Sequence, residues 1–198
     1  MRVVTISLLF SLSAVSALAQ IDLSGEWDPQ FHEDQPERIP GPEIGDYLGL
    51  PITDAARLRA DTWDASLLTL PEHQCKPHPS DYGPRGPANL RIWKEIDPST
   101  QQLIAWRTHI SWQAPERTIY MDGRPHPPAY APHTWQGFST GKWEGDWFVI
   151  DTRGFNDKSW LDDSGRPHTE QLHTQERFHL VDFGHLEAEI VIDDPGAY

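Results

Sequence analysis

The alternation of apolar and polar residues after residue 90 constrains the fold of this chain more than any other feature. From residue 104 to residue 112, every second position is apolar or threonine, namely Ile104, Trp106, Thr108, Ile110 and Trp112. A period of two residues is typical of a β-strand with one buried face. Comparable segments cover residues 118–121, 137–143, 147–152, 172–180 and 185–192. The sequence therefore predicts a mostly β fold, an antiparallel β-barrel or a sandwich, with long loops rich in Pro and Gly.

The last two segments also indicate how they pair. If residues 182–184 form a three-residue loop, Val181 lies opposite His185. A shift of one residue would place charged side chains on both faces of this hairpin. In the favoured register, one face is apolar or uncharged except for Glu176, the single carboxylate that it carries.

The residues before position 90 are organised differently. Residues 1–19 combine a positive start, an apolar run and a small-x-small site, which is typical of a secretory signal peptide. The mature chain is therefore expected in the periplasm or outside the cell. Residues 20–89 should form a strand, a Pro-rich arm and a short helix, packed on a β body of residues 90–198 within a single domain. The helix is predicted to begin after Thr53 as its N-cap and to end near Ala65.

Charge limits the partners that the chain can bind. The formal net charge is −14, and it becomes −15 once Arg2, the only charged residue of the signal peptide, is removed. Such a surface disfavours nucleic acid and anionic membranes. Beyond the signal peptide, no apolar run is long enough to cross a bilayer, so no membrane insertion is expected. The sequence favours a soluble monomer whose partner is a small-molecule ligand.

Several motifs in the second half of the chain carry a resemblance. They are YMDGRPHP at residues 120–127, TWQGFSTGKWEGD at 134–146, GFNDKSWL at 154–161, PHTEQLH at 167–173, ERF at 176–178 and DDPGAY at 193–198. Together they resemble a large family of exported bacterial proteins for which no activity is established. The resemblance implies export and no particular reaction. Family members usually continue beyond DDPGAY, so this chain is expected to be cut short.

A shorter resemblance concerns the start of the mature chain. The segment Leu23-Ser-Gly-Glu-Trp27 resembles the opening strand of lipocalin-type barrels. Within the two fold alternatives, this resemblance favours a closed or nearly closed barrel.

One group of residues suggests a ligand pocket. Arg124 follows a turn, and its guanidinium is suited to carboxylates or sugar hydroxyls. Tryptophans close to it in sequence are suited to forming the pocket walls. The candidate ligand-binding residues are Arg124, His126, His133, Trp135, Trp143 and Trp160, and the ligand would be a small organic or saccharide-like molecule. The alternative is that these side chains only pack loops against one another.

A second group suggests acid–base chemistry. Burial on the apolar face would raise the pKa of Glu176, as a general acid or base requires. With His173 and His168 as the other candidate catalytic residues, the chain would be a lyase, isomerase or hydrolase. The alternative is a structural buried ion pair between Glu176 and an inward arginine. Arg107, Arg124 and Arg153 are the arginines considered for that pair.

A third group suggests metal binding. The motif His73-x-Cys75-x-x-His78 combines imidazole and thiolate, which suit a copper or zinc ion. Its spacing matches no standard zinc motif, and the favoured interpretation is surface histidines near a buried cysteine, with no metal. Cys75 is the only cysteine, so a disulfide would need a partner outside this sequence. A structural or assembly role at the cell surface is a further, weaker alternative.

Overall fold

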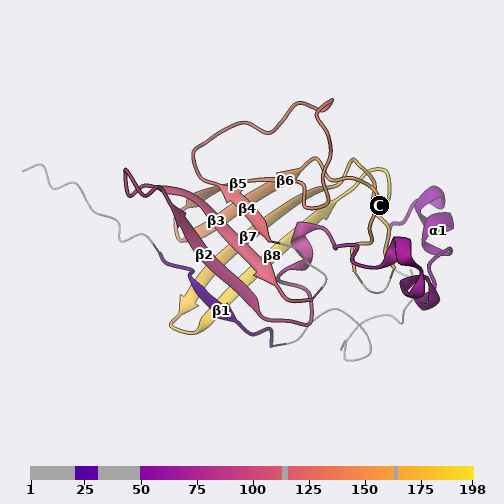
Figure 1. The fold of residues 1–198 in the computed structure, drawn as a ribbon, viewed down its shortest axis with the longest axis horizontal. Coiled ribbons are helices and arrows are strands. Elements are labelled where there is room, and N and C mark those ends of the chain that lie inside the picture. The colour runs from indigo at the N-terminus through magenta and orange to yellow at the C-terminus, as the bar shows by residue number, and fades with distance from the viewer. Residues whose placement is uncertain (1–20, 31–49, 113–115, 163–164) are drawn as a thin grey trace, which may run out of the picture.

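A computed structural model describes residues 21–30, 50–112, 116–162 and 165–198 (Figure 1). The predicted signal peptide and most of the predicted Pro-rich arm lie outside the described residues. The strands are β1 (Gly25–Trp27), β2 (Leu90–Ile96), β3 (Leu103–Ile110), β4 (Arg117–Tyr120), β5 (Phe138–Glu144), β6 (Trp147–Arg153), β7 (His173–Asp182) and β8 (His185–Asp193). The helices are α1 (Asp54–Ala60) and three short 3-10 helices, η1 (Ala65–Thr69), η2 (Pro71–His73) and η3 (Ser80–Tyr82).

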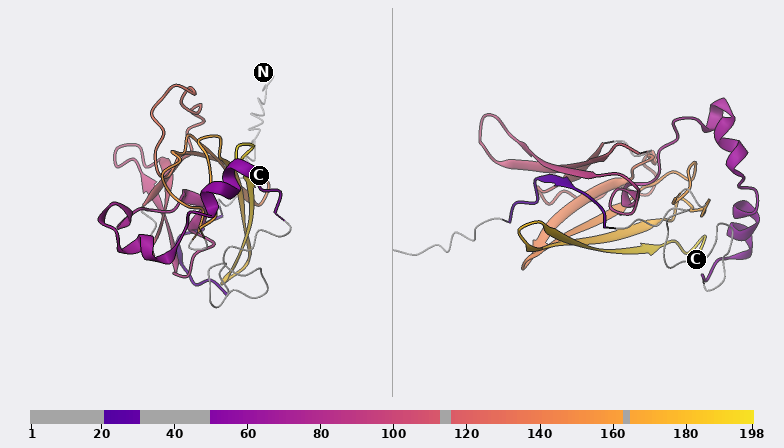
Figure 2. Two further views of the ribbon diagram at one scale, coloured as in Figure 1. Left: turned by 90° about the vertical axis from the view of Figure 1, so that its right-hand side faces the viewer. Right: turned by 90° about the horizontal axis from the view of Figure 1, so that it is seen from below.

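The eight strands form one curled sheet in which every strand pairs with its neighbour in the chain. Figures 1 and 2 show this sheet rolled into a barrel-like shape. Pairing is antiparallel except between β4 and β5, which run parallel. The parallel pair follows from the long connection at 121–137, which returns the chain to the end where β4 began. Since no ladder joins β1 to β8 in the described chain, the barrel is nearly closed, and the predicted mostly β fold is confirmed.

The predicted register of the final hairpin is confirmed along the strands and wrong at the loop. Glu176 lies opposite Ile190, as the charge pattern requires. At the tip, Asp182 and not Val181 pairs with His185, and the register shifts just before this pair. The loop therefore has two residues instead of the predicted three, and Val181 is the extra residue of a bulge.

The inward-facing residues of β5, β6 and β7 form three rows, each running across the three strands, and the rows follow one another along the barrel. The rows are Trp143, Phe148 and Phe178; then Gly141, Ile150 and Glu176; then Ser139, Thr152 and Thr174. A Cβ on Gly141 would lie 2.7 Å from the ring of Phe148, so only glycine leaves room for that ring. The interior thus changes from aromatic to polar along the barrel. We call the end marked by Ser139, Thr152 and Thr174 the polar end.

The aromatic part of the interior also receives Trp106 from β3. Trp106 is fully buried, and its ring centroid lies 6.0 Å from that of Phe148. Trp112, which the alternation assigned to the same face, lies beyond the end of β3 and is 45% exposed. The strand is therefore shorter than the alternating pattern.

Two segments cover the polar end, and we call them the capping segments. The first is residues 78–86, which include η3 and place Tyr82 in the main hydrophobic core. The second comprises residues 155–162 and 165–169, in which Phe155 and Leu161 pack with Leu172. Because both segments bury apolar side chains, their polar residues are drawn into the interior with them.

Helix α1 lies at the same end of the molecule as the C-terminal residue (Figures 1 and 2). Thr53 is its N-cap, as predicted, and Oγ1 accepts a hydrogen bond from the Ala56 amide at 3.2 Å. The Thr53 amide donates to the carbonyl of Ala197 at 2.8 Å, which ties the helix to the C-terminal segment. The helix ends at Ala60 and not near Ala65. No helix among the described residues is long and apolar enough to cross a membrane.

Candidate functional site

A buried ion pair connects β4 and β7 across the interior. Arg117 donates from Nη1 to Glu176 Oε2 at 2.9 Å and from Nη2 to Glu176 Oε1 at 2.7 Å. The same guanidinium donates to Ser139 Oγ at 2.9 Å and to Thr152 Oγ1 at 2.6 Å. Both carboxylate oxygens accept from a group that has no acceptor, which is the bidentate geometry of an ionised carboxylate. Glu176 is therefore fixed in one orientation by a buried cation.

The structure confirms Glu176 as an inward carboxylate and corrects its expected partner. The pairing arginine is Arg117, and not one of the three that the sequence analysis considered. Those three bind other carboxylates, namely Arg107 with Glu95 and Glu116, Arg124 with Asp122, and Arg153 with Asp151. Burial raises the pKa of Glu176, and the positive charge of Arg117 opposes that rise.

A second group of buried charges comes from the capping segments. The turn of η3 follows Pro79, and the amides of Arg85 and Gly86 donate to the Tyr82 carbonyl at 2.9 and 2.8 Å. This continued turn places Arg85 beside Asp81, with Nη2 2.8 Å from Asp81 Oδ2. Arg85 Nη2 also donates to the Leu161 carbonyl at 2.8 Å, so it joins the two capping segments.

The other capping segment completes this second group. Asp162 is buried, and its Oδ2 lies 3.9 Å from Arg85 Nη1. Arg166, four residues later, forms a closer ion pair with the same carboxylate. Asp162 therefore lies between two guanidinium groups.

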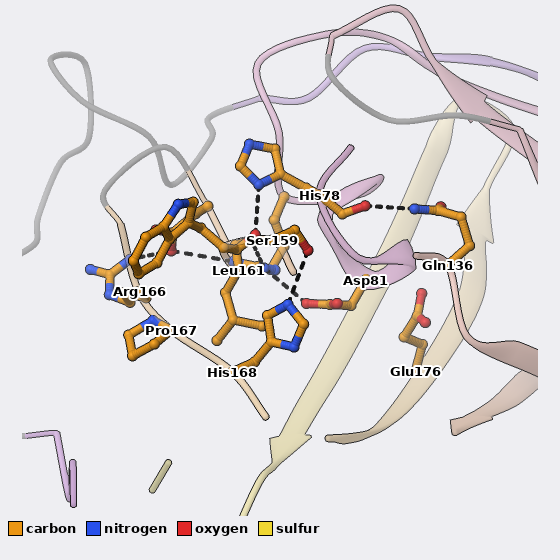
Figure 3. Close-up of polar contacts among 12 residues, drawn as sticks. His78, Asp81, Gln136, Ser159, Leu161, Arg166, Pro167, His168 and Glu176 are labelled. Atoms are coloured by element: carbon orange, nitrogen blue, oxygen red, sulfur yellow. Dashed lines mark hydrogen bonds and ion pairs between the residues drawn. The ribbon is translucent and has the colours of Figure 1, made fainter. Parts of the chain in front are cut away.

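The two groups of charges face each other at the polar end. Figure 3 shows Glu176 pointing from β7 towards the segment that carries Asp81. The negative charge of Asp81 adds to the effect of burial in raising the pKa of Glu176. The site is thus the region between η3 and the inward face of β7.

The buried polar atoms without a hydrogen-bond partner among the described residues include three side-chain oxygens of this region. These oxygens are Asp81 Oδ1 and Ser80 Oγ on η3, and Thr174 Oγ1 on β7. A buried polar atom left without a partner costs about 1–3 kcal/mol. Native proteins satisfy such atoms with ordered water or with a ligand. The polar end therefore has hydrogen-bonding capacity that the described residues do not use.

His168 lies at the same end and pairs with a serine. Its Nε2 is 3.0 Å from Ser159 Oγ, and both residues are buried. Burial lowers the pKa of His168, while a hydrogen bond with the backbone of Thr169 and the charge of Asp81 oppose this effect. His168 is therefore held in its neutral form more strongly than a free histidine.

This burial predicts a pH dependence of stability. The pKa of His168 in the unfolded chain is near its ordinary value of 6.5, and it is lower in the folded protein. Below pH 6.5 the unfolded state gains a proton that the folded state does not yet bind. The contribution of neutral His168 to the free energy of unfolding is therefore fully present above that pH. As the pH falls below it, the free energy of unfolding decreases by up to about 1.4 kcal/mol per pH unit.

Urea unfolding at several pH values measures this effect. His168→Gln should remove that part of the acid destabilisation, whereas the control His185→Gln, at an exposed histidine of the final hairpin, should keep it. Parallel pH profiles for wild type and His168→Gln would contradict the assignment.

The third candidate catalytic residue lies elsewhere. His173 is on the outward face of β7, and its Nε2 is 2.7 Å from Asp151 Oδ2. His126 approaches the same carboxylate from the long connection before β5, with Nε2 3.3 Å from Oδ1. The structure thus brings Glu176 and His168 to one end of the barrel and separates His173 from both.

The candidate ligand-binding residues do not form one group. Arg124 is exposed, pairs with Asp122 and lies over the ring of Tyr120. Trp143 packs against Phe148 in the aromatic part of the interior. The others are also dispersed: His126 contacts Asp151, His133 Nδ1 lies 3.7 Å from Glu170, Trp135 is half-buried, and Trp160 belongs to a capping segment. Of the six, Trp160 alone is part of the covering of the polar end.

The candidate metal ligands are also not brought together. Cys75 is exposed and has a φ of 60°, and no residue forms a disulfide with it. His78 is buried, and its Nδ1 lies 2.7 Å from the carbonyl oxygen of Trp160. The expectation of a buried cysteine is therefore wrong. In the ranges that the structure covers, no group of three or more His, Cys, Asp or Glu side chains is arranged to hold a metal ion.

The sequence analysis missed most charged residues of the polar end, and Arg117, Ser80 and Asp81 show why. Arg117 shares a face with Ile119, so a strand beginning one residue earlier would have identified it as inward. Ser80 and Asp81 occur in a Pro- and Gly-rich stretch without periodicity. Their only signal was the spacing of Asp81 and Arg85, four residues apart, which suggests an ion pair on a helical turn.

Comparison with known proteins adds no assignment. No protein-family model, no curated protein and no solved structure matches this chain, so the geometry of the polar end is the basis for the functional conclusion.

Proposed function

We propose that this chain is an exported β-barrel-like protein that binds a small organic molecule at the polar end, between η3 and β7. The observation that carries the proposal is the set of unpartnered buried atoms on Asp81, Ser80 and Thr174. They lie at one end of a barrel-like sheet, where ligands enter barrels of this kind. Export is proposed from the signal-peptide pattern of residues 1–19.

Binding is favoured over acid–base catalysis by the state of Glu176. Both of its oxygens accept from Arg117, which stabilises the ionised carboxylate and opposes the protonation that acid–base exchange with a substrate requires. Its geometry supports the alternative of a structural ion pair. Asp81, by contrast, keeps one carboxylate oxygen available.

The proposal is tested by a ligand screen on the mature protein. The probes are monosaccharides, polyols, small aromatic acids and small amines, with thermal unfolding and tryptophan fluorescence as the readouts. A ligand present at a hundred times its Kd should add about 2.7 kcal/mol to the free energy of unfolding. Nine tryptophans, including Trp160 in a capping segment, make fluorescence a suitable reporter.

Two site variants and one control locate the binding. Asp81→Asn and Ser80→Ala should weaken any ligand found by at least about tenfold, which is about 1.4 kcal/mol. Because Ser80 Oγ has no hydrogen bond within the described chain, Ser80→Ala should fold normally. Asp146→Asn, in the exposed loop between β5 and β6, should change nothing. The proposal fails if no probe stabilises the protein, or if both site variants bind as wild type does.

A further inference from the structure

We infer that the ligand of the polar end is an uncharged molecule that carries hydroxyl groups. This inference rests on the proposed binding function and specifies its ligand class. It follows from two independent properties of the site, the balance of its buried charges and the kind of atoms that lack partners.

The charges at the polar end cancel. Glu176 pairs with Arg117, Asp81 with Arg85, and Asp162 lies between Arg85 and Arg166. These are three carboxylates and three guanidinium groups, each carboxylate within an ion pair. Arg59 from α1 is a further, half-buried cation beside them, and it donates to the carbonyls of His168 and Ser159. The one other buried carboxylate in the described part of the chain, Asp194, accepts hydrogen bonds from Thr169 and Gly196.

A charged ligand would disturb this balance. A carboxylate placed between η3 and β7 would approach Asp81 and Glu176, and the cations that pair with these two acids, Arg85 and Arg117, are already engaged by them. An ammonium group there would add a positive charge beside the guanidinium groups of Arg85 and Arg117, and the two carboxylates that it would face already pair with them. Both would lose hydration without gaining a counter-ion, which is unfavourable in a buried site.

The unpartnered atoms fit hydroxyl groups. Asp81 Oδ1 can only accept a hydrogen bond, whereas the hydroxyls of Ser80 and Thr174 can donate and accept. A ligand hydroxyl can donate to Asp81 while accepting from Ser80. An ammonium cannot accept, and a carboxylate cannot donate. A polyhydroxylated molecule therefore satisfies all three atoms with one kind of group.

Matched sugars test the inference by calorimetry and thermal unfolding at equal ionic strength. The first series is D-glucose, D-glucuronate and D-glucosamine, and the second is the corresponding galactose series. Within each series the ring is kept while a carboxylate or an ammonium replaces a neutral group. We expect the neutral member of at least one series to bind, and its charged relatives to bind at least about tenfold more weakly.

A second measurement is the relative affinity of Asp81→Asn for the charged and neutral sugars. If Asp81 were purely structural, this substitution would leave that relative affinity unchanged. The substitution removes one negative charge and leaves Arg85 with only the more distant Asp162, at 3.9 Å, which Arg85 shares with Arg166, so the preference should shift towards the uronate relative to the neutral sugar. Asp146→Asn should leave the preference unchanged.

The outcomes separate this inference from the proposed function. A uronate or amino sugar that binds wild type as tightly as the neutral sugar overturns the inference and leaves the binding function in place. The inference is also overturned, and the binding function again kept, if only acids, amines or other molecules without hydroxyl groups bind in the screen. If no probe of any class binds, both are overturned.

Discussion

Replacing Arg117 by methionine while Glu176 is retained should lower the free energy of unfolding by about 3–5 kcal/mol. The substitution leaves a fully buried carboxylate without its cation, and it removes the donor that Ser139 and Thr152 share. Taking an unpaired charge out of water is far more costly than losing a contact on the surface. Urea unfolding followed by tryptophan fluorescence measures the loss.

Two further variants make this prediction specific. The double variant Arg117→Met with Glu176→Leu should recover most of the lost stability, because an apolar pair leaves no buried charge. Arg177→Met is the matched control, since Arg177 follows Glu176 in the chain but pairs with Glu189 on the exposed face of β7. It should cost about 1 kcal/mol or less. Equal losses for Arg117→Met and Arg177→Met would contradict the account of the interior.

Trp106→Ala should lower the free energy of unfolding by a similar amount, about 3–5 kcal/mol. Trp106 is fully buried and packs against Phe148 at the aromatic part of the barrel. Removing the indole leaves a cavity that strands fixed by hydrogen bonds cannot close. The same urea experiment measures the effect.

The control for this variant is Trp93→Ala. Trp93 is on β2 and half-buried, with Arg91 over its ring outside the core. It should cost about 1 kcal/mol or less. If both tryptophan variants were destabilised equally, the alternation along these strands would not mark the core.

The alternation predicted much of the fold because one face of each strand is buried. The face containing Glu176 and Phe178 was identified from the sequence, since a shift of one residue would have buried charges. The bulge at Val181 was not predicted, because a two-residue loop combined with a one-residue bulge gives the same pairing farther along the strands as the predicted three-residue loop. The end of α1 was also misplaced, because Asp64 begins a separate 3-10 helix by accepting a hydrogen bond from the Ser66 amide.

The candidate site was harder to predict because it depends on which strands are neighbours. The sequence identified Glu176 as a buried carboxylate and left open whether it was catalytic or paired. Its partner depends on the parallel pairing of β4 with β5, which brings Arg117 to Ser139 and then across to β7. No local pattern encodes that neighbourhood, so Arg117 was missed.

Asp81 and Ser80 show a second limit. Irregular segments have no period from which an inward face can be inferred, and the capping segments are irregular on both sides of η3. Conversely, the histidines and tryptophans that are close together in sequence are dispersed over the inside, the outside and one end of the barrel. Closeness along the chain was a poor guide there, because alternate residues of a strand point to opposite faces.

The most direct test of the central claim is a crystal structure of the mature protein grown with the neutral sugar that stabilises it most. The account predicts sugar density between η3 and β7, with hydroxyl groups within hydrogen-bond distance of Asp81 Oδ1 and Ser80 Oγ. The contradicting result is a structure at saturating sugar in which ordered waters alone satisfy these two atoms and the sugar is absent from the polar end.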